Sequence, residues 1–501
     1  MAGLLVAGCP ESWQPREKGP GSALWIGTHS EPLEASDTSR LTEAGVGEVY
    51  LTVARFDPDD PEGPLVSIEA PDPPPSIPVT LAISGVWEGE TETEDLAERV
   101  AEAARQLRFA AESRGGVPIG VHFDLLEASS FESYGEFLSA LRKALDRTLF
   151  LSISLHRSWI GRPEIEPMLD AVDFVVPFLY GQRVNETEDG KAWDFVELEI
   201  QLQKLEELGV PYLIGVVGLG TATHLSEAGG VKARTTRLSL QEILWNQNLK
   251  LRPGFSLEGV NRRVYAVAAE RATSVGNWKL VKGEGVRVVR AATSDIEELN
   301  RLVSAGDNPS HQGQVYYRLP STEERLSLTL ENLYNALDPS PAAPDLALDL
   351  SLQRRTGRGW LMRFSITNGN GEISELSLID SNYVQVTALN GVFSSRVKPG
   401  DFYRYELYRT GGGEPVRDIR RPDLLRLHLP IMEGRQHLAS GDVEVKVQGN
   451  PELQIEGRFL LPDGRTLDVG PRVWRDGRFE DEIAAPDEGV GEPDADEAGG
   501  G

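Results

Sequence analysis

Residues 117–124 read Val-Pro-Ile-Gly-Val-His-Phe-Asp, and residues 149–156 read Leu-Phe-Leu-Ser-Ile-Ser-Leu-His. Both are short, largely apolar runs, and an amphipathic segment separates them. Runs of this length that alternate with helical periodicity are typical of parallel βα units. Because successive strand residues point to opposite faces, each run has one apolar face and one polar face.

The polar faces of the two runs indicate where function lies. They comprise Gly120, His122 and Asp124 in the first run, and Ser152, Ser154 and His156 in the second. The apolar faces should meet the surrounding helices, so the polar faces should look inward. A purely structural barrel fills its interior with branched apolar side chains. Polar inward faces on neighbouring strands therefore predict a functional mouth near Asp124.

Six further runs of this kind complete a barrel. The eight expected strands are residues 24–29, 48–56, 78–84, 117–124, 149–156, 172–180, 211–219 and 314–319. Together they predict an α/β fold, a (β/α)8 TIM-like barrel over residues 23–338. An insertion at about residues 222–292 carries its own strands, and one of these, 263–269 or 285–291, is an alternative eighth strand.

The pattern changes after the barrel. Short runs with strict apolar alternation follow a proline-rich linker, and they predict a C-terminal β-sandwich over residues 345–478. Residues 479–501 then contain nine acidic side chains and no basic one, which is typical of a disordered tail. At the other end, residues 1–22 are expected to form a tether.

Composition excludes several classes of function. The chain has 501 residues, a net charge of −28 and one cysteine. Such acidity disfavours a nucleic-acid partner, because binding to phosphates needs a basic surface. One cysteine excludes disulfides within the chain and any cysteine-based zinc site. No dinucleotide or phosphate-loop motif is present, so no cofactor is expected.

The single cysteine ends the stretch Leu4-Leu5-Val6-Ala7-Gly8-Cys9. Small residues before a cysteine are similar to a bacterial lipoprotein box, in which Cys9 would carry a lipid. That interpretation predicts membrane attachment and a location in the cell envelope, or secretion. The other interpretation is an unmodified thiol in a cytoplasmic protein, and the sequence leaves both open.

Aromatic side chains near the strand ends suggest a sugar ligand. Trp25, Trp87, Trp159 and Tyr180 could offer ring faces, and imidazole and amide groups could bind hydroxyls. The candidate substrate-binding residues are His29, Trp87, His122, His156, Trp159, Tyr180 and Gln182. The alternative is that several of these rings simply pack in the core.

Carboxylates at the same end suggest glycoside hydrolysis. Asp124 would act as the acid, with Glu127 or Glu88 as its partner, because this chemistry commonly uses two carboxyl groups about 5–10 Å apart. Asp124 and Glu127 could converge if the chain turned directly after Asp124. The structural alternative pairs Asp124 with His156 or Arg157. No His-x-His motif supports a metal at His122 and His156, so none is expected.

Several segments of the barrel share a recognisable pattern. They read Pro118-Ile119-Gly120-Val121-His122-Phe123-Asp124, Tyr134-x-x-Phe137-Leu138-x-x-Leu141-Arg142, Leu151-Ser152-Ile153-Ser154 and Ser158-Trp159, with Ala171-Val172-Asp173 and residues 315–320 further on. These segments resemble domain-of-unknown-function family 3142, a bacterial family, over roughly residues 22–337. The resemblance implies a glycosidase-like barrel, distantly similar to family 18 chitinase-type barrels. The fourth strand of those chitinases ends in Asp-x-Asp-x-Glu, whereas this chain has Leu126 where the second Asp is expected.

The sequence therefore predicts a glycoside-hydrolase-like envelope protein that binds or cleaves a polysaccharide at the barrel mouth. The alternative is a non-catalytic envelope lipoprotein that scaffolds an unidentified protein partner, and the departure at Leu126 favours it.

Overall fold

The computed structural model describes most of residues 21–480. The residues it leaves out within that range are 29, 31, 59, 61–62, 75, 89–92, 180–194, 239–241, 244–245, 252–263, 290, 292, 307, 322, 325, 338–344, 356–358, 370–381, 403, 412–413, 430–431, 433–435 and 461–465. The described chain forms two compact units, the first ending at residue 342 and the second continuing from residue 343. Cys9, the tether up to residue 20 and residues 481–501 lie outside the described residues. Among the described helices, none is long and apolar enough to cross a membrane.

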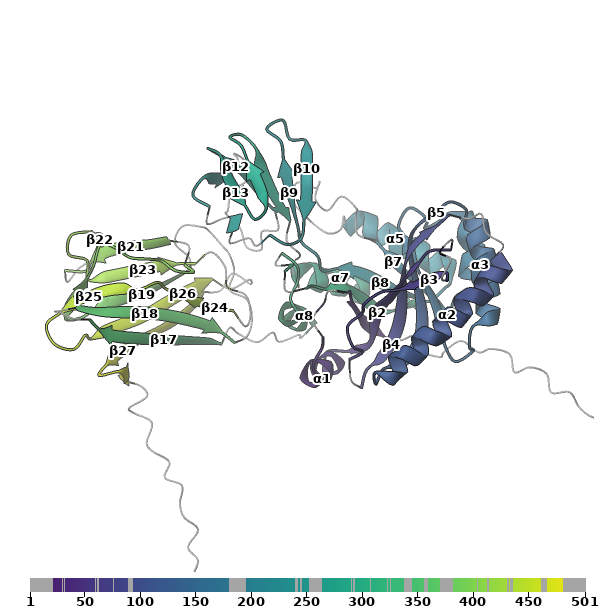
Figure 1. The fold of residues 1–501 in the computed structure, drawn as a ribbon, viewed down its shortest axis with the longest axis horizontal. Coiled ribbons are helices and arrows are strands. Elements are labelled where there is room, and N and C mark those ends of the chain that lie inside the picture. The colour runs from purple at the N-terminus through teal and green to yellow at the C-terminus, as the bar shows by residue number, and fades with distance from the viewer. Residues whose placement is uncertain are drawn as a thin grey trace, which may run out of the picture. The chain divides into compact units, whose positions relative to one another are not determined.

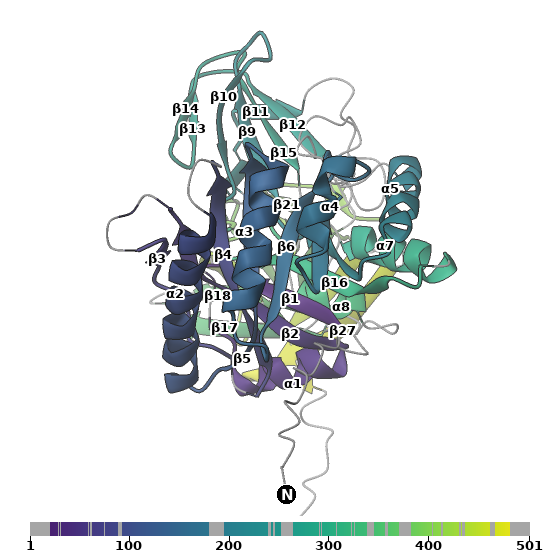
Figure 2. The same cartoon turned by 90° about the vertical axis from the view of Figure 1, so that its right-hand side faces the viewer.

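A closed parallel barrel forms the first unit (Figures 1 and 2). Its strands are β1 (Ser22–Ile26), β2 (Val46–Phe56), β4 (Pro78–Trp87), β5 (Val117–Ala128), β6 (Phe150–His156), β7 (Phe174–Phe178), β8 (Tyr212–Val217) and β16 (His311–Leu319). Their order is β1-β16-β8-β7-β6-β5-β4-β2, and a parallel pairing of β1 with β2 closes the ring. This confirms the predicted TIM-like barrel, with the run at residues 314–319 as its eighth strand.

Helices follow most strands, as the periodicity predicts. They are α1 (Ala35–Glu43), α2 (Thr93–Ser113), α3 (Phe131–Ala144), the short η1 (Pro163–Ile165) and α4 (Glu166–Leu169), α5 (Phe195–Leu208), α7 (Thr293–Ala305) and α8 (Leu330–Leu337). Ser130 caps α3 by accepting a hydrogen bond from the Ser133 amide at 3.2 Å. Between β2 and β4 the described chain forms only β3 (Leu65–Ser67), antiparallel to β2.

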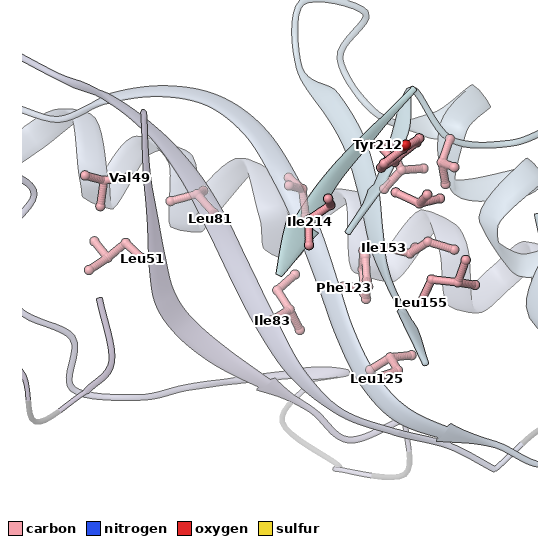
Figure 3. Packing of buried hydrophobic residues seen from close by; sticks show 14 of the residues in the cluster. Val49, Leu51, Leu81, Ile83, Phe123, Leu125, Ile153, Leu155, Tyr212 and Ile214 are labelled. Atoms are coloured by element: carbon pink, nitrogen blue, oxygen red, sulfur yellow. The ribbon is translucent and has the colours of Figure 1, made fainter. Parts of the chain in front are cut away.

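The outward faces of the strands build the main core (Figure 3). Val121, Phe123 and Ile153 are at most 1% exposed and pack with apolar residues of the helices. The Phe137 ring of α3, for example, lies 5.9 Å from that of Phe123. The predicted alternation in β5 and β6 is therefore confirmed, and it fixes which side chains face the barrel axis.

The insertion after β8 forms its own antiparallel sheet. Its strands are β9 (Thr221–Leu225), β10 (Val231–Thr235), β11 (Leu249–Leu251), β12 (Val264–Ala269) and β15 (Gly285–Val289), and β13 (Thr273–Val275) with β14 (Trp278–Leu280) makes a hairpin. The sheet order is β10-β9-β15-β12-β11. The two runs proposed as alternative eighth strands are β12 and β15, which belong to this sheet and not to the barrel.

The second unit contains two antiparallel sheets around one core. One has the order β17-β18-β25-β20, with β24 beside β18, and the other β22-β21-β23-β19-β26-β27-β28. The strands are β17 (Leu346–Arg354), β18 (Gly359–Asn368), β19 (Tyr383–Ala388), β20 (Gly391–Phe393), β21 (Arg404–Arg409), β22 (Val416–Arg417), β23 (Leu424–His428), β24 (His437–Ala439), β25 (Val443–Val447), β26 (Leu453–Leu460), β27 (Thr466–Arg475) and β28 (Arg478–Phe479). Phe364 and Val445 of the first sheet share a core with Val386 and Leu425 of the second, as the predicted sandwich requires.

Candidate functional site

An aromatic cluster fills the interior of the barrel. Trp25 of β1 stacks on Tyr50 of β2, with ring centroids 5.3 Å apart. The rings of Tyr317 and His122 meet Trp25 edge-on, at 5.1 and 5.3 Å. Trp25 and Tyr50 are at most 2% exposed. They therefore form the floor beneath the strand ends rather than an open platform.

A chain of hydrogen bonds rises from this floor to Asp124. His122 contacts Ser152 Oγ through Nδ1 at 2.9 Å and Ser154 Oγ through Nε2 at 3.0 Å. Ser154 Oγ donates to Asp124 Oδ1 at 2.7 Å. Since Ser154 has one proton and gives it to Asp124, it accepts from His122, which places the imidazole proton on Nε2. Ser152 then donates to Nδ1.

Burial shifts the pKa values of both titratable groups in this series of hydrogen bonds, His122 and Asp124. His122 is fully buried, and burial lowers its pKa to about 3, so the imidazole is neutral near pH 7. Asp124 is 5% exposed, and burial raises its pKa to about 6, although the Ser154 hydrogen bond opposes the rise. Asp124 can therefore hold or release a proton close to neutral pH, which suits a general acid or a hydrogen-bond donor.

The upper rim of the barrel retains some exposure. Ser84 of β4 and Tyr317 of β16 are partly exposed near the carboxyl ends of their strands. Thr52 within β2 is partly exposed and accepts a hydrogen bond from Trp25 Nε1 at 2.8 Å. Ser84 is paired in register with Asp124. Burial raises the pKa of Tyr317 to about 12, and the nearby Asp124 carboxylate contributes to the rise. Ser84 and the partly exposed Tyr317 are therefore neighbours of Asp124 on this rim.

The segment that follows β16 is held in place by hydrogen bonds to Glu324. Arg318 donates two hydrogen bonds to Glu324, at 2.9 and 2.7 Å. Glu324 also accepts from the Ser321 amide and from Thr236 Oγ1, each at 3.0 Å. Thr236 belongs to the insertion, so this buried carboxylate ties the insertion to the end of β16. Gly27, directly after β1, lies close to Arg318: a Cβ there would be 3.0 Å from Arg318 Cδ.

Trp87, predicted to bind substrate, lies in the core between β4 and α3. Its ring is 4.8 Å from Phe137 and 5.3 Å from Tyr134, and its Nε1 donates to Ser133 Oγ at 2.9 Å. It is 2% exposed. Its polar atom and both ring faces are therefore occupied by the protein, as the core-packing alternative proposed.

Trp159 and His156 contact residues other than Asp124. Trp159 is 6% exposed and packs edge-on against Phe131 of α3 at 5.2 Å. His156 Nδ1 contacts Ser158 Oγ at 2.7 Å, and burial lowers the pKa of the imidazole. Ser154, not His156 or Arg157, donates to Asp124, so the predicted structural pairing is wrong.

The carboxylates expected to assist Asp124 are solvent-exposed. Glu127 and Glu88 are both exposed, whereas Asp124 is buried. The chain does not turn after Asp124, because β5 continues to Ala128 with a register shift opposite Trp87. The turn on which the predicted Asp124–Glu127 pair depended is therefore absent.

The other predicted site residues cannot be placed. His29, Tyr180 and Gln182 lie outside the described residues, as does Cys9. Within the described ranges, no group of three or more His, Cys, Asp or Glu side chains could hold a metal ion.

Sequence reasoning missed Tyr50 and Tyr317, and it did not connect Ser154 with Asp124. Side-chain alternation could have found the tyrosines. Tyr50 shares its parity with Thr52 in the second expected strand, and Tyr317 with Val315 in the eighth, and all four face the axis. The hydrogen bond from Ser154 depends on the relative stagger of β5 and β6, which one sequence does not reveal.

Comparisons with known proteins give a distant likeness in fold. No family model and no curated protein matches the chain, so the resemblance to family 3142 is unconfirmed. Among solved structures, a chitinase of Chromobacterium violaceum is 15% identical over 64% of this chain and 98% of its own, with a TM-score of 0.40. The spore cortex-lytic enzyme SleL of Bacillus cereus is 14% identical over 64% of this chain and 74% of its own, with a TM-score of 0.40. A fungal endo-β-N-acetylglucosaminidase of glycosyl hydrolase family 18 is 11% identical over 64% of this chain and 99% of its own, with a TM-score of 0.36. The chain is thus distantly similar in fold to family 18 chitinase-like barrels, and at these scores the likeness carries no argument about activity.

Proposed function

We propose that the barrel is a glycoside-hydrolase-like domain that binds a sugar unit at its mouth, with Asp124 as the central polar group. The observation that supports this most is a buried carboxyl group at the carboxyl end of a barrel strand, with a pKa raised to about 6. Catalytic and binding groups of such barrels stand at that end of the strands. Ser84, which is partly exposed and paired in register with Asp124, adds a hydroxyl group that can bind a sugar.

Asp124 would bind the sugar in one of two protonation states. Below about pH 6 the carboxyl group carries a proton and donates to a ligand oxygen, and above it the carboxylate accepts from a hydroxyl. For hydrolysis, Asp124 would protonate the glycosidic oxygen as the bond to the anomeric carbon breaks, and water would add to that carbon and return a proton to Asp124. A second group must then stabilise the developing positive charge. Glu127 and Glu88 are exposed, which favours binding over cleavage.

The test is a panel of oligosaccharides built from N-acetylglucosamine, glucose or mannose, measured with the full chain by titration calorimetry and by release of reducing ends. We expect at least one to bind, with an affinity reduced tenfold or more by Asp124→Ala. Glu98→Gln on α2 is a matched exposed control and should bind like the wild type. Equal affinities for wild type and Asp124→Ala would contradict the proposal, and turnover lost in Asp124→Asn would extend it to catalysis.

Attachment to the cell envelope through Cys9 is a separate proposal. It depends on the sequence Leu4-Leu5-Val6-Ala7-Gly8-Cys9 alone. Palmitate labelling of the wild type that Cys9→Ser abolishes would support it. Absence of label from the wild type would contradict it.

A further inference from the structure

The second unit contains a groove with a volume of about 850 Å³. Its walls come from the β17–β18 turn, the β19–β20 turn, the end of β21, the segment before β23, and β25. This volume lies within the range of pockets that hold small organic ligands, which is about 300–1,000 Å³. The sequence predicted a β-sandwich here and no binding site.

The lining of the groove carries more positive than negative charge. Its charged side chains are Arg355, Arg409, Arg421, Lys446, Asp423 and Glu444. None of the four basic groups forms an ion pair with a carboxylate of the described residues. Residues 345–480 contain 19 basic and 19 acidic side chains, so the excess of acidic residues in the chain lies outside this unit. All four basic side chains are exposed, and Arg409 also acts electrostatically on the Asp418 carboxylate. Several basic groups around one groove favour an anionic ligand.

Side-chain hydrogen bonds hold the walls of the groove in place. The Asp423 carboxylate accepts from the Thr410 amide at 2.7 Å and from its hydroxyl at 3.0 Å. Asn390 accepts from the Glu452 amide at 3.0 Å and donates to the Asn450 carbonyl at 2.9 Å. These bonds fix the loops on either side before any ligand arrives, so binding would cost little ordering entropy.

The two carboxylates of the lining, Glu444 and Asp423, restrict which anionic ligands fit the groove. Glu444 can accept hydrogen bonds from hydroxyls, and together with Asp423 it would repel closely spaced phosphates. A hydroxyl-rich ligand with a few separated carboxylates fits this lining.

We propose that this groove binds a short acidic oligosaccharide of the uronate type. Arg409, Arg421 and Lys446 bind its carboxylates, and Glu444 accepts from its hydroxyls. Arginine suits this role because its planar fork binds a carboxylate through two parallel hydrogen bonds. The groove lies in the second unit, so the proposal stands independently of the sugar proposed for Asp124.

The test is titration calorimetry of the full chain with trigalacturonate and with its methyl ester, which has the same hydroxyls and no charge. We expect trigalacturonate to bind at least tenfold more tightly than the ester. The triple variant Arg409→Ser, Arg421→Ser, Lys446→Ser should reduce the affinity for trigalacturonate at least tenfold. The matched control Arg396→Ser, Lys398→Ser, Arg458→Ser removes equal charge from exposed positions outside the groove, and it should change the affinity less than twofold.

Three results would overturn the proposal. They are no binding to the wild type, equal binding of acid and ester, or equal losses in the groove variant and the control. Tighter binding of a peptide with the sequence of residues 481–501 would also overturn it, by making an acidic peptide the better ligand. Asp124→Asn distinguishes the two sites, because a loss of trigalacturonate affinity in this variant would assign the binding to the barrel mouth and overturn the proposal for the groove.

Discussion

Replacing Asp124 with asparagine should stabilise the barrel near neutral pH and leave it almost unchanged at pH 4. Burial raises the pKa of this carboxyl group from an ordinary 3.8 to about 6, so the folded protein holds the proton more tightly than the unfolded chain. Stability therefore falls as pH rises from about 4 to about 6, and the cost of the buried charge is constant above that. At 1.36 kcal/mol per pKa unit, the cost reaches ~3 kcal/mol at pH 7 and ~0.6 kcal/mol at pH 4.

Asparagine removes this cost and keeps an oxygen that accepts from Ser154. The free energy of unfolding should be measured for both proteins between pH 4 and 8 by urea titration, read by hydrogen exchange in peptides from β5 and β6, so that the barrel is followed separately from the second unit. The difference between the variants cancels other titrating groups. A difference independent of pH, or one favouring the wild type at pH 7, would refute the buried-acid account. Glu98→Gln, exposed on α2, should change stability by less than ~0.5 kcal/mol at each pH.

Three further substitutions test the packing around the site. Ser154→Ala should lower the free energy of unfolding by about 1–3 kcal/mol, since buried polar atoms lose a partner. It should also raise the pKa of Asp124 further. An unchanged midpoint in the titration of Asp124 would contradict the hydrogen bond. Trp87→Ala should cost about 3–5 kcal/mol in thermal or urea unfolding, whereas sugar affinity of the folded protein should not change; a selective loss of affinity would restore its predicted binding role. Gly220→Ala should destabilise the barrel by about 1–3 kcal/mol, because a Cβ at this position would lie 2.1 Å from the Leu326 carbonyl oxygen. A free energy of unfolding equal to that of the wild type would contradict this contact.

The barrel was predictable because strand periodicity is local. Each of the eight expected strands overlaps an observed one, since parallel strands buried on both faces read as apolar runs whatever their neighbours. The same alternation places Trp87 with Leu81 and Ile83 on the core side of β4. Applied to that strand, it would have assigned Trp87 to packing and not to the mouth.

Features that depend on strand stagger were not predictable. β5 continues through Glu127 to Ala128 with a register shift, so the expected turn does not form, and pattern alone does not encode a bulge. The contact between Ser154 and Asp124 needs the alignment of β5 against β6. The groove of the second unit gathers side chains from residues 355 to 448, which meet only when two sheets fold together.

The most direct test of the central claim is a titration of the Asp124 carboxyl carbon by NMR, assigned with Asp124→Asn, in the free protein and with the best-binding oligosaccharide. A sugar seated at the mouth predicts a free pKa near 6 that shifts when the oligosaccharide saturates the protein. An ordinary pKa near 4, or one that the bound sugar leaves unchanged, would contradict a sugar-binding acid at the mouth of the barrel.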